Sequence, residues 1–401
     1  MSSQPTSAQT AVHAHDETFH TEQVITIAGG HFVHDTFSAF IAPLLPVLQE
    51  KLSTNYALAG SLTIFAQLPG LMNPFVGYLA DKISLRYFII LAPGITATLM
   101  SLMGIMPSYA ALAFLLVIAG LSIAAFHAPA PAMIGRVSGN RTGTGMSIFM
   151  ASGELGRALG PLLVTAGITW FGLEGLWKLM ILGWITSAVL YFRLRHVSAS
   201  SRPTLDGQMI RDLLPRARQV FIILIWLMLA RQFLLVSLTT FLPLFMTDVK
   251  QADLWLSNSS LTILEGAGVV GALMSGTLSD RLGRRRMLGI VLALAPLFML
   301  LFLFGPTGLT AVSLALLGFT VLAPTAVMLA LVQDQFPTNR ALANGSFLAT
   351  NFLIRSLAVW VVGAASDRFG LAPVFLWSGI IAWLSVPSVW FLPPSKKTVI
   401  G

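Results

Sequence analysis

The sequence contains no cysteine and very little charge. Without cysteine the chain has neither disulfides nor thiolate metal sites. Charged residues make up 10% of the 401 residues and hydrophobic residues 55%, whereas soluble domains carry roughly 25% charged residues. The mean hydropathy is +0.80. A soluble protein of this length could not bury so much apolar surface, so the composition indicates a membrane protein.

The first 22 residues also lack lysine and arginine, so they do not have the basic start of a secretory signal. This polar segment contains His13, His15 and His20 with Asp16 and Glu17. It could bind a metal or be a disordered tail, and we expect a disordered cytoplasmic tail at 1–22. We expect no cofactor and no metal site in this protein.

Long apolar runs fill most of the remaining sequence. A spanning helix needs about 20 mostly apolar residues, because lipid offers no partner for free backbone groups. The runs predict twelve transmembrane helices, at 23–49, 55–80, 87–105, 110–135, 143–169, 174–192, 218–247, 256–279, 287–304, 309–334, 343–366 and 371–392. We therefore expect an all-α membrane protein with two six-helix bundles, at 23–192 and 218–392. A cytoplasmic linker at 193–217 joins them, and a cytoplasmic tail follows at 393–401.

The second set of six spans repeats the first. Gly77-Tyr78-Leu79-Ala80-Asp81-Lys82 returns 199 residues later as Gly276-Thr277-Leu278-Ser279-Asp280-Arg281. Arg157 returns as Arg355, and Phe171-Gly172-Leu173 as Phe369-Gly370-Leu371. Two such halves side by side are how many secondary transporters are built, with substrate held between them near the bilayer midplane.

The positions of the basic residues predict the orientation. The net charge of +8 could suggest nucleic acid, but the lysines and arginines lie at the ends of the predicted helices, as membrane topology requires. With both termini inside, the outer connections hold only Lys51, Lys178, Lys250 and Arg368 of the 24 basic residues. Three more lie within helices, and the rest are in inner connections or the C-terminal tail. We expect both termini in the cytoplasm and no nucleic-acid partner.

Several ionisable residues lie inside the predicted spans, where a charge costs about 2.5–3.5 kcal/mol on insertion scales. Spans three, six, nine and twelve carry none near their centres, so we expect these four to face lipid. The intramembrane set comprises His31, His34, Asp35, His127, Glu154, Arg157, Arg231, Glu265 and Arg355. The charges could simply tie helices together, but three carboxylates and three arginines also make a nearly balanced set for a polar cavity.

The spacing of these residues suggests how they group. His31, His34 and Asp35 lie on one helix face, and Glu154 could pair with Arg157 three residues on. His31 is the weakest candidate, because a packing histidine is the simpler interpretation. Gln67 stands at the repeat position of Glu265, and His34 at that of Arg231. An asymmetric lining of this kind suits a small polar substrate.

The two copies of the loop motif resemble the signature loop of the major facilitator superfamily. The motif reads Gly77-x-x-x-Asp81-Lys82 in the first half and Gly276-x-x-x-Asp280-Arg281 in the second. The glycine permits close helix approach, and the acid can cap a neighbouring helix or pair with an arginine. We expect these loops to gate the halves on the cytoplasmic side. The resemblance implies the facilitator fold.

A second motif, Gly156-x-x-x-Gly160-Pro161, resembles the glycine–proline motif of facilitator drug:proton antiporters and is a further candidate for gating. Much of residues 25 to 165 is similar to the fosmidomycin-resistance group of exporters. The similarity lies in Gly30-His31-Phe32 with Asp35, Pro43 to Leu48, Phe126-His127, and Gly145-x-Ser147-x-Phe149. That group typically has a proline and a glutamate after Phe-His, where this chain has Ala128 and Pro129.

The resemblance implies a proton-coupled exporter in a bacterial inner membrane that moves a small organic anion or toxic compound, such as a phosphonate antibiotic. Its partners would be the small-molecule substrate, protons and membrane lipid, and we expect a monomer. Substrate would bind to Arg157, Arg231, Arg355, His127 and Gln67, because guanidinium makes bidentate contacts with anions. Protons would be carried by Asp35, Glu265 or Glu154 with help from His34.

Two alternatives remain at this stage. A proton-driven importer of a small anionic metabolite would use the same buried charges. A non-transporting receptor or a membrane enzyme is a different class, but the sequence has neither a nucleophile–base pair nor a phosphate loop, and we expect no enzymatic activity.

Overall fold

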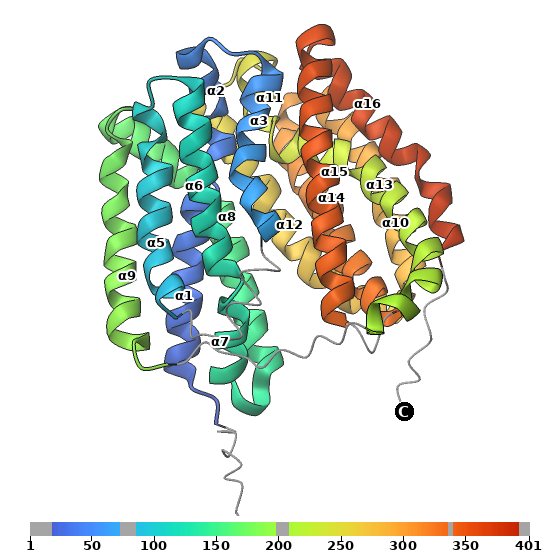
Figure 1. Cartoon of the computed structure of the whole chain (residues 1–401). Helices are drawn as coiled ribbons and strands as arrows, with labels where there is room; N and C mark the ends of the chain where they lie inside the picture. The colour runs from blue at the N-terminus through green and yellow to red at the C-terminus, as the bar shows by residue number, and fades with distance from the viewer. Residues whose placement is uncertain (1–17, 73–85, 198–207, 336–339, 393–401) are drawn as a thin grey trace, which may run out of the picture.

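The computed structural model describes residues 18–72, 86–197, 208–335 and 340–392. Over these residues the chain is helical, without β-strands, and each of the twelve predicted spans contains helix. The helices form two groups that stand side by side (Figure 1). α1 begins and α16 ends at the same end of the molecule.

The first half contains α-helices and short 3₁₀ helices, which carry the symbol η. They are α1 (Thr21–Ser38), α2 (Ile41–Leu52), α3 (Tyr56–Gln67), η1 (Leu68–Met72), α5 (Arg86–Ser101), η2 (Leu102–Ile105), α6 (Tyr109–His127), α7 (Ala130–Val137), η3 (Gly139–Arg141), α8 (Thr142–Phe171), η4 (Leu176–Leu179) and α9 (Met180–Leu194).

The second half has the same kinds of element. They are α10 (Gln208–Thr239), α11 (Leu242–Asp248), α12 (Leu254–Leu282), α13 (Arg284–Phe304), η5 (Thr307–Leu309), α14 (Thr310–Gln335), α15 (Arg340–Phe369), α16 (Leu371–Leu384) and η6 (Val386–Phe391).

Three spans predicted as single helices are each divided into two α-helices in the structure. The first breaks between α1 and α2 before Pro43, and the seventh breaks between α10 and α11 before Pro243. The fourth breaks at Pro129, between α6 and α7. Proline has no N–H for the carbonyl four residues earlier, so the helix opens at these points. The seventh span also begins earlier than predicted, at Gln208, because Met209, Ile210, Leu213 and Leu214 continue an apolar pattern at helical spacing.

The sequence repeat extends to the packing of the helices. In the first half Gly120 of α6 lies against the carbonyl oxygen of Ala66 in α3, and a side chain there would overlap that oxygen. In the second half Gly318 of α14 meets the carbonyl of Leu264 in α12 in the same way. Each residue of the second pair lies 198 residues after its equivalent in the first pair. A glycine at the equivalent position therefore permits the same close helix contact in each half.

The outer surface is apolar, as a bilayer requires. In the described part of the chain, eight helices are long and apolar enough to cross a membrane. Large hydrophobic side chains are exposed on the spans predicted to face lipid, including Ile181 and Phe192 of α9, Leu297 of α13 and Trp383 of α16. In a bilayer these exposed apolar faces contact lipid, whereas their exposure to water would be unfavourable.

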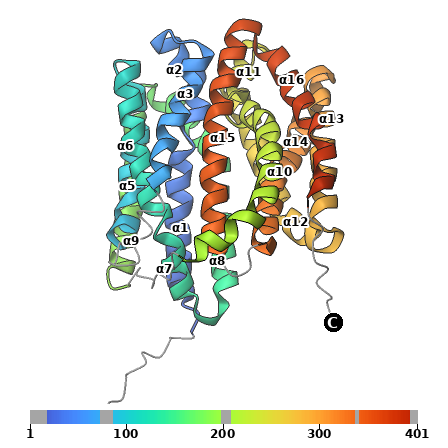
Figure 2. The ribbon, with the colours of Figure 1, turned by 45° about the vertical axis from the view of Figure 1, so that its right-hand side comes forward.

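The two halves meet closely at one end, which we call the closed end: the side of the molecule formed by α2, α11 and the first turns of α3 and α12. It lies opposite the start of α1 (Figure 1). One apolar core there includes Leu44 and Leu45 of the first half and Phe241 and Val359 of the second. The amide nitrogen of Asn258 donates to the Thr165 hydroxyl at 2.7 Å across the halves. α15 runs beside α3 (Figure 2).

Candidate functional site

Asp35 lies at the centre of a buried polar cluster in the first half. Its carboxylate is 1% exposed and has four side-chain neighbours. One oxygen, Oδ1, lies 3.0 Å from Nδ1 of His34 and 3.3 Å from Nε2 of His127. The other, Oδ2, lies 3.3 Å from both Nε2 of His31 and the guanidinium of Arg157. We call these five residues the Asp35 cluster.

Three helices bring the Asp35 cluster together. His31, His34 and Asp35 share one face of α1, as their spacing predicts, His127 is the last residue of α6, and Arg157 comes from α8. α8 reaches α1 closely because Gly156 lies against the backbone of Phe32 and Thr36, and Gly160 against that of Thr36. These two glycines therefore set the distance between Arg157 and Asp35. Pro161 follows in the same helix. The gating role expected of Gly156, Gly160 and Pro161 remains a prediction.

Each histidine of the Asp35 cluster has a hydrogen-bond partner besides its contact with Asp35. Nδ1 of His31 donates to the Phe149 carbonyl at 2.8 Å, and Nδ1 of His127 donates to the Ile123 carbonyl at 3.0 Å. A carbonyl oxygen only accepts, so both histidines carry hydrogen on Nδ1. His34 differs, because its Nε2 lies 3.2 Å from the Thr96 hydroxyl while its Nδ1 faces Asp35. His31, expected as a packing histidine, also stacks on the Phe149 ring.

Arg157 links the Asp35 cluster to the second half. Its guanidinium forms an ion pair with Glu154 one turn earlier in α8, as the sequence spacing suggests. The Arg157 side chain is 41% exposed and that of Glu154 is 28% exposed, whereas Asp35 is buried. Arg157 also interacts electrostatically with Glu265 of α12, which in turn interacts with Arg355 of α15. Charges from the two halves therefore meet between them.

The two arginines of the second half have different surroundings. Arg231 of α10 is 1% exposed and donates to the Val321 carbonyl at 3.1 and 3.2 Å and to the Thr325 hydroxyl at 2.5 Å. Pro324 lies inside α14 at this turn and has no N–H to donate. Arg355 is partly exposed and donates to the Thr239 hydroxyl at 3.2 Å, while its Nε has no hydrogen-bond partner. Arg355 therefore has the greater unused capacity to bind an anion.

Of the other predicted site residues, those that the structure describes lie apart from this cluster. Gln67 is partly exposed and ends α3. The first loop motif, with Gly77, Asp81 and Lys82, lies outside the described residues. In the second motif, Gly276 and Asp280 belong to the backbone of α12, and Arg281 is exposed near the end of that helix. Their gating role remains a prediction.

The structure adds a contact between the halves that the sequence analysis missed. The Asp367 carboxylate of α15 accepts hydrogen bonds from the backbone N–H groups of Tyr56 and Ala57, at 2.6 and 3.1 Å. The Tyr56 hydroxyl donates to Asp248 at 2.7 Å. The first N–H groups of a helix have no partner within it, so Asp367 caps α3 from the other half. We call Tyr56, Asp248 and Asp367 the closed-end latch.

A sequence signal for this latch exists. Gly363-Ala364-Ala365-Ser366-Asp367-Arg368-Phe369-Gly370 repeats the pattern of the second loop motif, Gly276 to Gly283. Gly363 lies so close to α3 that a Cβ there would be 2.6 Å from the Ala57 Cα. Glycine therefore permits the helix approach and the acid caps the neighbouring helix, as proposed above for the loop motifs. This third copy lies at the end of α15, at the closed end of the molecule.

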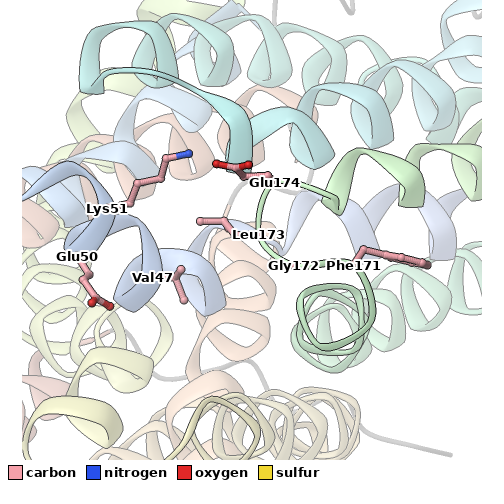
Figure 3. A pocket seen from close by; sticks show the side chains of 7 residues that line it. All are labelled: Val47, Glu50, Lys51, Phe171, Gly172, Leu173 and Glu174. Carbon is pink, nitrogen blue, oxygen red and sulfur yellow. The ribbon is translucent and has the colours of Figure 1, made fainter.

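A surface pocket of about 650 Å³ lies at the closed end of the first half (Figure 3). α2 and the turn after α8 line it with Val47, Glu50, Lys51, Phe171, Gly172, Leu173 and Glu174. The Lys51 ammonium donates to the Gly104 carbonyl at 2.5 Å. None of the predicted site residues lines this pocket, so it is separate from the charge set between the halves.

Several known bacterial proteins match this chain, two of them over nearly its whole length. The chain is 24% identical to the fosmidomycin resistance protein of Escherichia coli (strain K12), with 92% of each chain covered. It is 26% identical to an uncharacterized MFS-type transporter, YfnC, of Bacillus subtilis (strain 168), with 93% of each covered. It is 33% identical to an MFS-type efflux pump of Mycolicibacterium smegmatis (strain ATCC 700084 / mc(2)155), with 33% of each covered.

Solved structures share the fold at 15% identity. The nucleoside transporter NupG (D323A mutant) superposes with a TM-score of 0.76, covering 92% of this chain and 99% of that one. A D-xylose–proton symporter gives a TM-score of 0.74, with 96% and 100% covered. These matches confirm the predicted fold of two six-helix bundles. The family model of the Major Facilitator Superfamily matches residues 27–358 and 258–400, so this chain is a multi-pass membrane transporter and a member of that superfamily.

Proposed function

We propose that this secondary transporter exports a small organic anion or toxic compound from a bacterial cell in exchange for protons. The observation that carries the proposal is the charge set between the halves, where Arg157 of the first half interacts with Glu265 of the second, beside Arg355. A substrate held between two halves would meet these groups first.

Glu265 is our candidate for the proton carrier. Its cationic neighbours belong to different halves, Arg157 to the first and Arg355 to the second. When the halves move against each other, the charge around Glu265 changes, which is what coupling to a proton requires. The neighbours of Asp35 all come from the first half and would move with it. Asp35, Glu154 and His34 remain further candidates.

Arg157 and Arg355 are the proposed anion-binding residues. Guanidinium groups donate two parallel hydrogen bonds to a carboxylate or phosphonate. Both side chains are partly exposed, and the Nε of Arg355 is free of a hydrogen-bond partner. Arg231 would have to exchange its bonds with α14 before it could bind substrate. His127, whose side chain is 34% exposed, and Gln67 are proposed to contribute polar contacts.

The direction of transport is proposed from two sources. The relatives include a fosmidomycin resistance protein and an efflux pump by name. The Gly156, Gly160 and Pro161 motif resembles that of facilitator antiporters. Labelled fosmidomycin is a suitable probe in everted membrane vesicles, whose lumen corresponds to the cell exterior.

We expect energised everted vesicles that contain this protein to accumulate the probe and to lose it when a protonophore collapses the pH gradient. Vesicles without the protein provide the background. Accumulation that persists with the protonophore would contradict proton coupling, and probe driven out of the lumen would indicate the importer. If nothing moves, fosmidomycin is not a substrate, and the proposal loses its support for phosphonate cargo.

We further propose that both termini are cytoplasmic, which the asymmetry of lysine and arginine supports. The closed end then faces outward, and its latch holds the halves together on that side. Because the chain has no cysteine, a single Val359→Cys substitution can report on opening. Val359 is buried and packs beside Gly60 of the other half.

Asp367→Ala should speed the labelling of Val359→Cys several-fold, because α3 loses two of its capping hydrogen bonds and the halves separate more often. The reagent is a membrane-impermeant maleimide added to intact cells. Asp253→Ala is the matched control, since Asp253 caps α12 within one half by accepting from Leu256 N–H at 2.7 Å. Equal labelling in both variants would argue against the latch, and labelling only after cell lysis would reverse the orientation.

A further inference from the structure

The Asp35 cluster contains lone pairs that face one another. His31 and His127 both donate their Nδ1–H groups to backbone carbonyls, so in the neutral state their Nε2 atoms carry lone pairs. Each Nε2 points at an oxygen of Asp35, at 3.3 Å in both cases. The Nε2 of His31 is buried and makes no hydrogen bond. Two nitrogens and a carboxylate that can only accept are held together by a cation, which is either a proton on each nitrogen or a metal ion between them.

The spacing of these atoms matches the ligand shell of a small divalent metal. Zinc bonds to histidine nitrogen and carboxylate oxygen at about 2.0–2.2 Å, so two ligands of a tetrahedral site lie about 3.4 Å apart. Nε2 of His31 lies 3.3 Å from Oδ2 of Asp35, and Nε2 of His127 lies 3.3 Å from the other oxygen, Oδ1. One ligand atom from each of the three residues lies within 4.8 Å of the other two. A hydrated calcium or magnesium ion would instead require mostly oxygen ligands.

The surroundings have the second layer of contacts that metal-binding histidines need. A metal-ligating histidine donates its other ring N–H to a carbonyl or carboxylate, which fixes the ring. His31 does so to Phe149 and His127 to Ile123. His34 faces Asp35 with its Nδ1 and so holds the carboxylate in place.

Charge and access also favour a cation. Asp35 and Glu154 are acidic, and among the described residues Arg157 is the one arginine or lysine that forms an ion pair with them, so these three residues together carry a charge of −1 when the histidines are neutral. The Asp35 carboxylate is buried, but the His127 side chain is 34% exposed and gives an ion a way in. The fourth metal position would be open to water or substrate on that side.

We propose that His31, Asp35 and His127 form a binding site for a divalent transition-metal ion of the zinc class. Two imidazoles and one carboxylate are a borderline ligand set that zinc and cobalt accept. No local spacing in the sequence indicates this site, because His127 lies in a different helix from the other two ligands. The proposal does not depend on the direction or substrate of transport, since it concerns binding alone.

The test is a titration of the purified full-length protein with Co²⁺, followed by displacement with Zn²⁺. The reference protein carries His13→Ala, His15→Ala and His20→Ala, because those histidines could bind metal on their own, and its purification tag contains no histidine. We expect one Co²⁺ per chain with a visible absorption spectrum of low-coordinate cobalt, which one equivalent of Zn²⁺ removes. Absence of stoichiometric binding would overturn the proposal without any ligand variant.

The ligand variants are His31→Asn and His127→Asn. Asparagine keeps an N–H group near the position of Nδ1, so the bond to the backbone carbonyl can persist while the Nε2 lone pair is lost. Each variant should weaken Co²⁺ binding at least tenfold. The control is His196→Asn, an exposed histidine at the end of α9 outside the cluster, which should bind as the reference does.

Thermal unfolding of each variant without metal checks that it is folded. A further variant, Glu265→Gln, tests whether metal binding is independent of the residue proposed to carry the proton. Glu265→Gln should bind Co²⁺ normally, because it leaves all three ligands intact. If folded His31→Asn and His127→Asn variants bind Co²⁺ as tightly as the reference, the site is elsewhere and the proposal is wrong. A variant that does not fold is replaced by His31→Gln or His127→Gln, to which the same criterion applies.

Discussion

Glu265→Gln is expected to abolish the accumulation of substrate driven by a pH gradient while leaving exchange of substrate across the membrane intact. The amide has nearly the size of the carboxyl group but cannot load and release a proton. Glu265 interacts with Arg157 of one half and Arg355 of the other, so its protonation is the event that movement of the halves can control. The measurement compares pH-driven uptake with counterflow in proteoliposomes that contain each variant.

Two substitutions serve as comparisons for Glu265→Gln. Glu174→Gln removes an exposed carboxylate at the closed-end pocket and should transport normally. Asp35→Asn tests the other candidate. If Asp35→Asn loses accumulation and Glu265→Gln keeps it, the proton is carried within the first half and our assignment of Glu265 is wrong. If both keep it, Glu154 is the remaining intramembrane carboxylate to test.

Gly156→Ala is expected to destabilise the first half and to disrupt the Asp35 cluster. A methyl group at this position would overlap the Phe32 carbonyl oxygen and lie 3.0 Å from the Thr36 nitrogen, both in the backbone of α1. Backbone cannot move aside as a side chain can, so α8 must shift away from α1. Overpacking of this kind costs about 1–3 kcal/mol. The shift would also move Arg157, the next residue, from its position 3.3 Å from Asp35.

Thermal unfolding of the purified variant measures this effect, and Gly29→Ala is the matched control. Gly29 lies in α1, the helix that Gly156 of α8 contacts, but a Cβ at Gly29 would meet no atom within 4 Å. The control should be neutral or slightly more stable, because alanine favours helix over glycine by about 1 kcal/mol. Equal unfolding temperatures for the two variants would mean that the contact of α8 with α1 is looser than the structure indicates.

The helical architecture was predictable because membrane insertion places a strong local constraint on sequence. Each span must be apolar over its own length, so the spans can be located without knowing their neighbours. The places where prediction failed are also local in origin. Pro43, Pro129 and Pro243 interrupt spans that hydropathy alone treats as continuous, because a hydropathy average does not register a missing N–H.

The candidate site was predictable only as a set of residues. Buried charges are costly in a membrane, so Asp35, Arg157 and Glu265 stand out in sequence. The i, i+3 and i, i+4 spacings also placed His31 and His34 beside Asp35, and Glu154 beside Arg157. Which helices meet was not encoded in any local spacing. The contact of Asp35 with His127 and Arg157 depends on how α1, α6 and α8 pack.

The sequence by itself determined the membrane class, the number of spans, the repeat of the two halves and the identity of the buried charges. The tertiary structure alone decided that Arg157 faces both Asp35 and Glu265, that Arg231 is turned towards α14, and that Asp367 caps α3 across the halves. The reason is physical. Hydropathy and helix periodicity act over one or two turns, whereas a close approach of two helices depends on small residues such as Gly156 and Gly363 meeting a particular backbone.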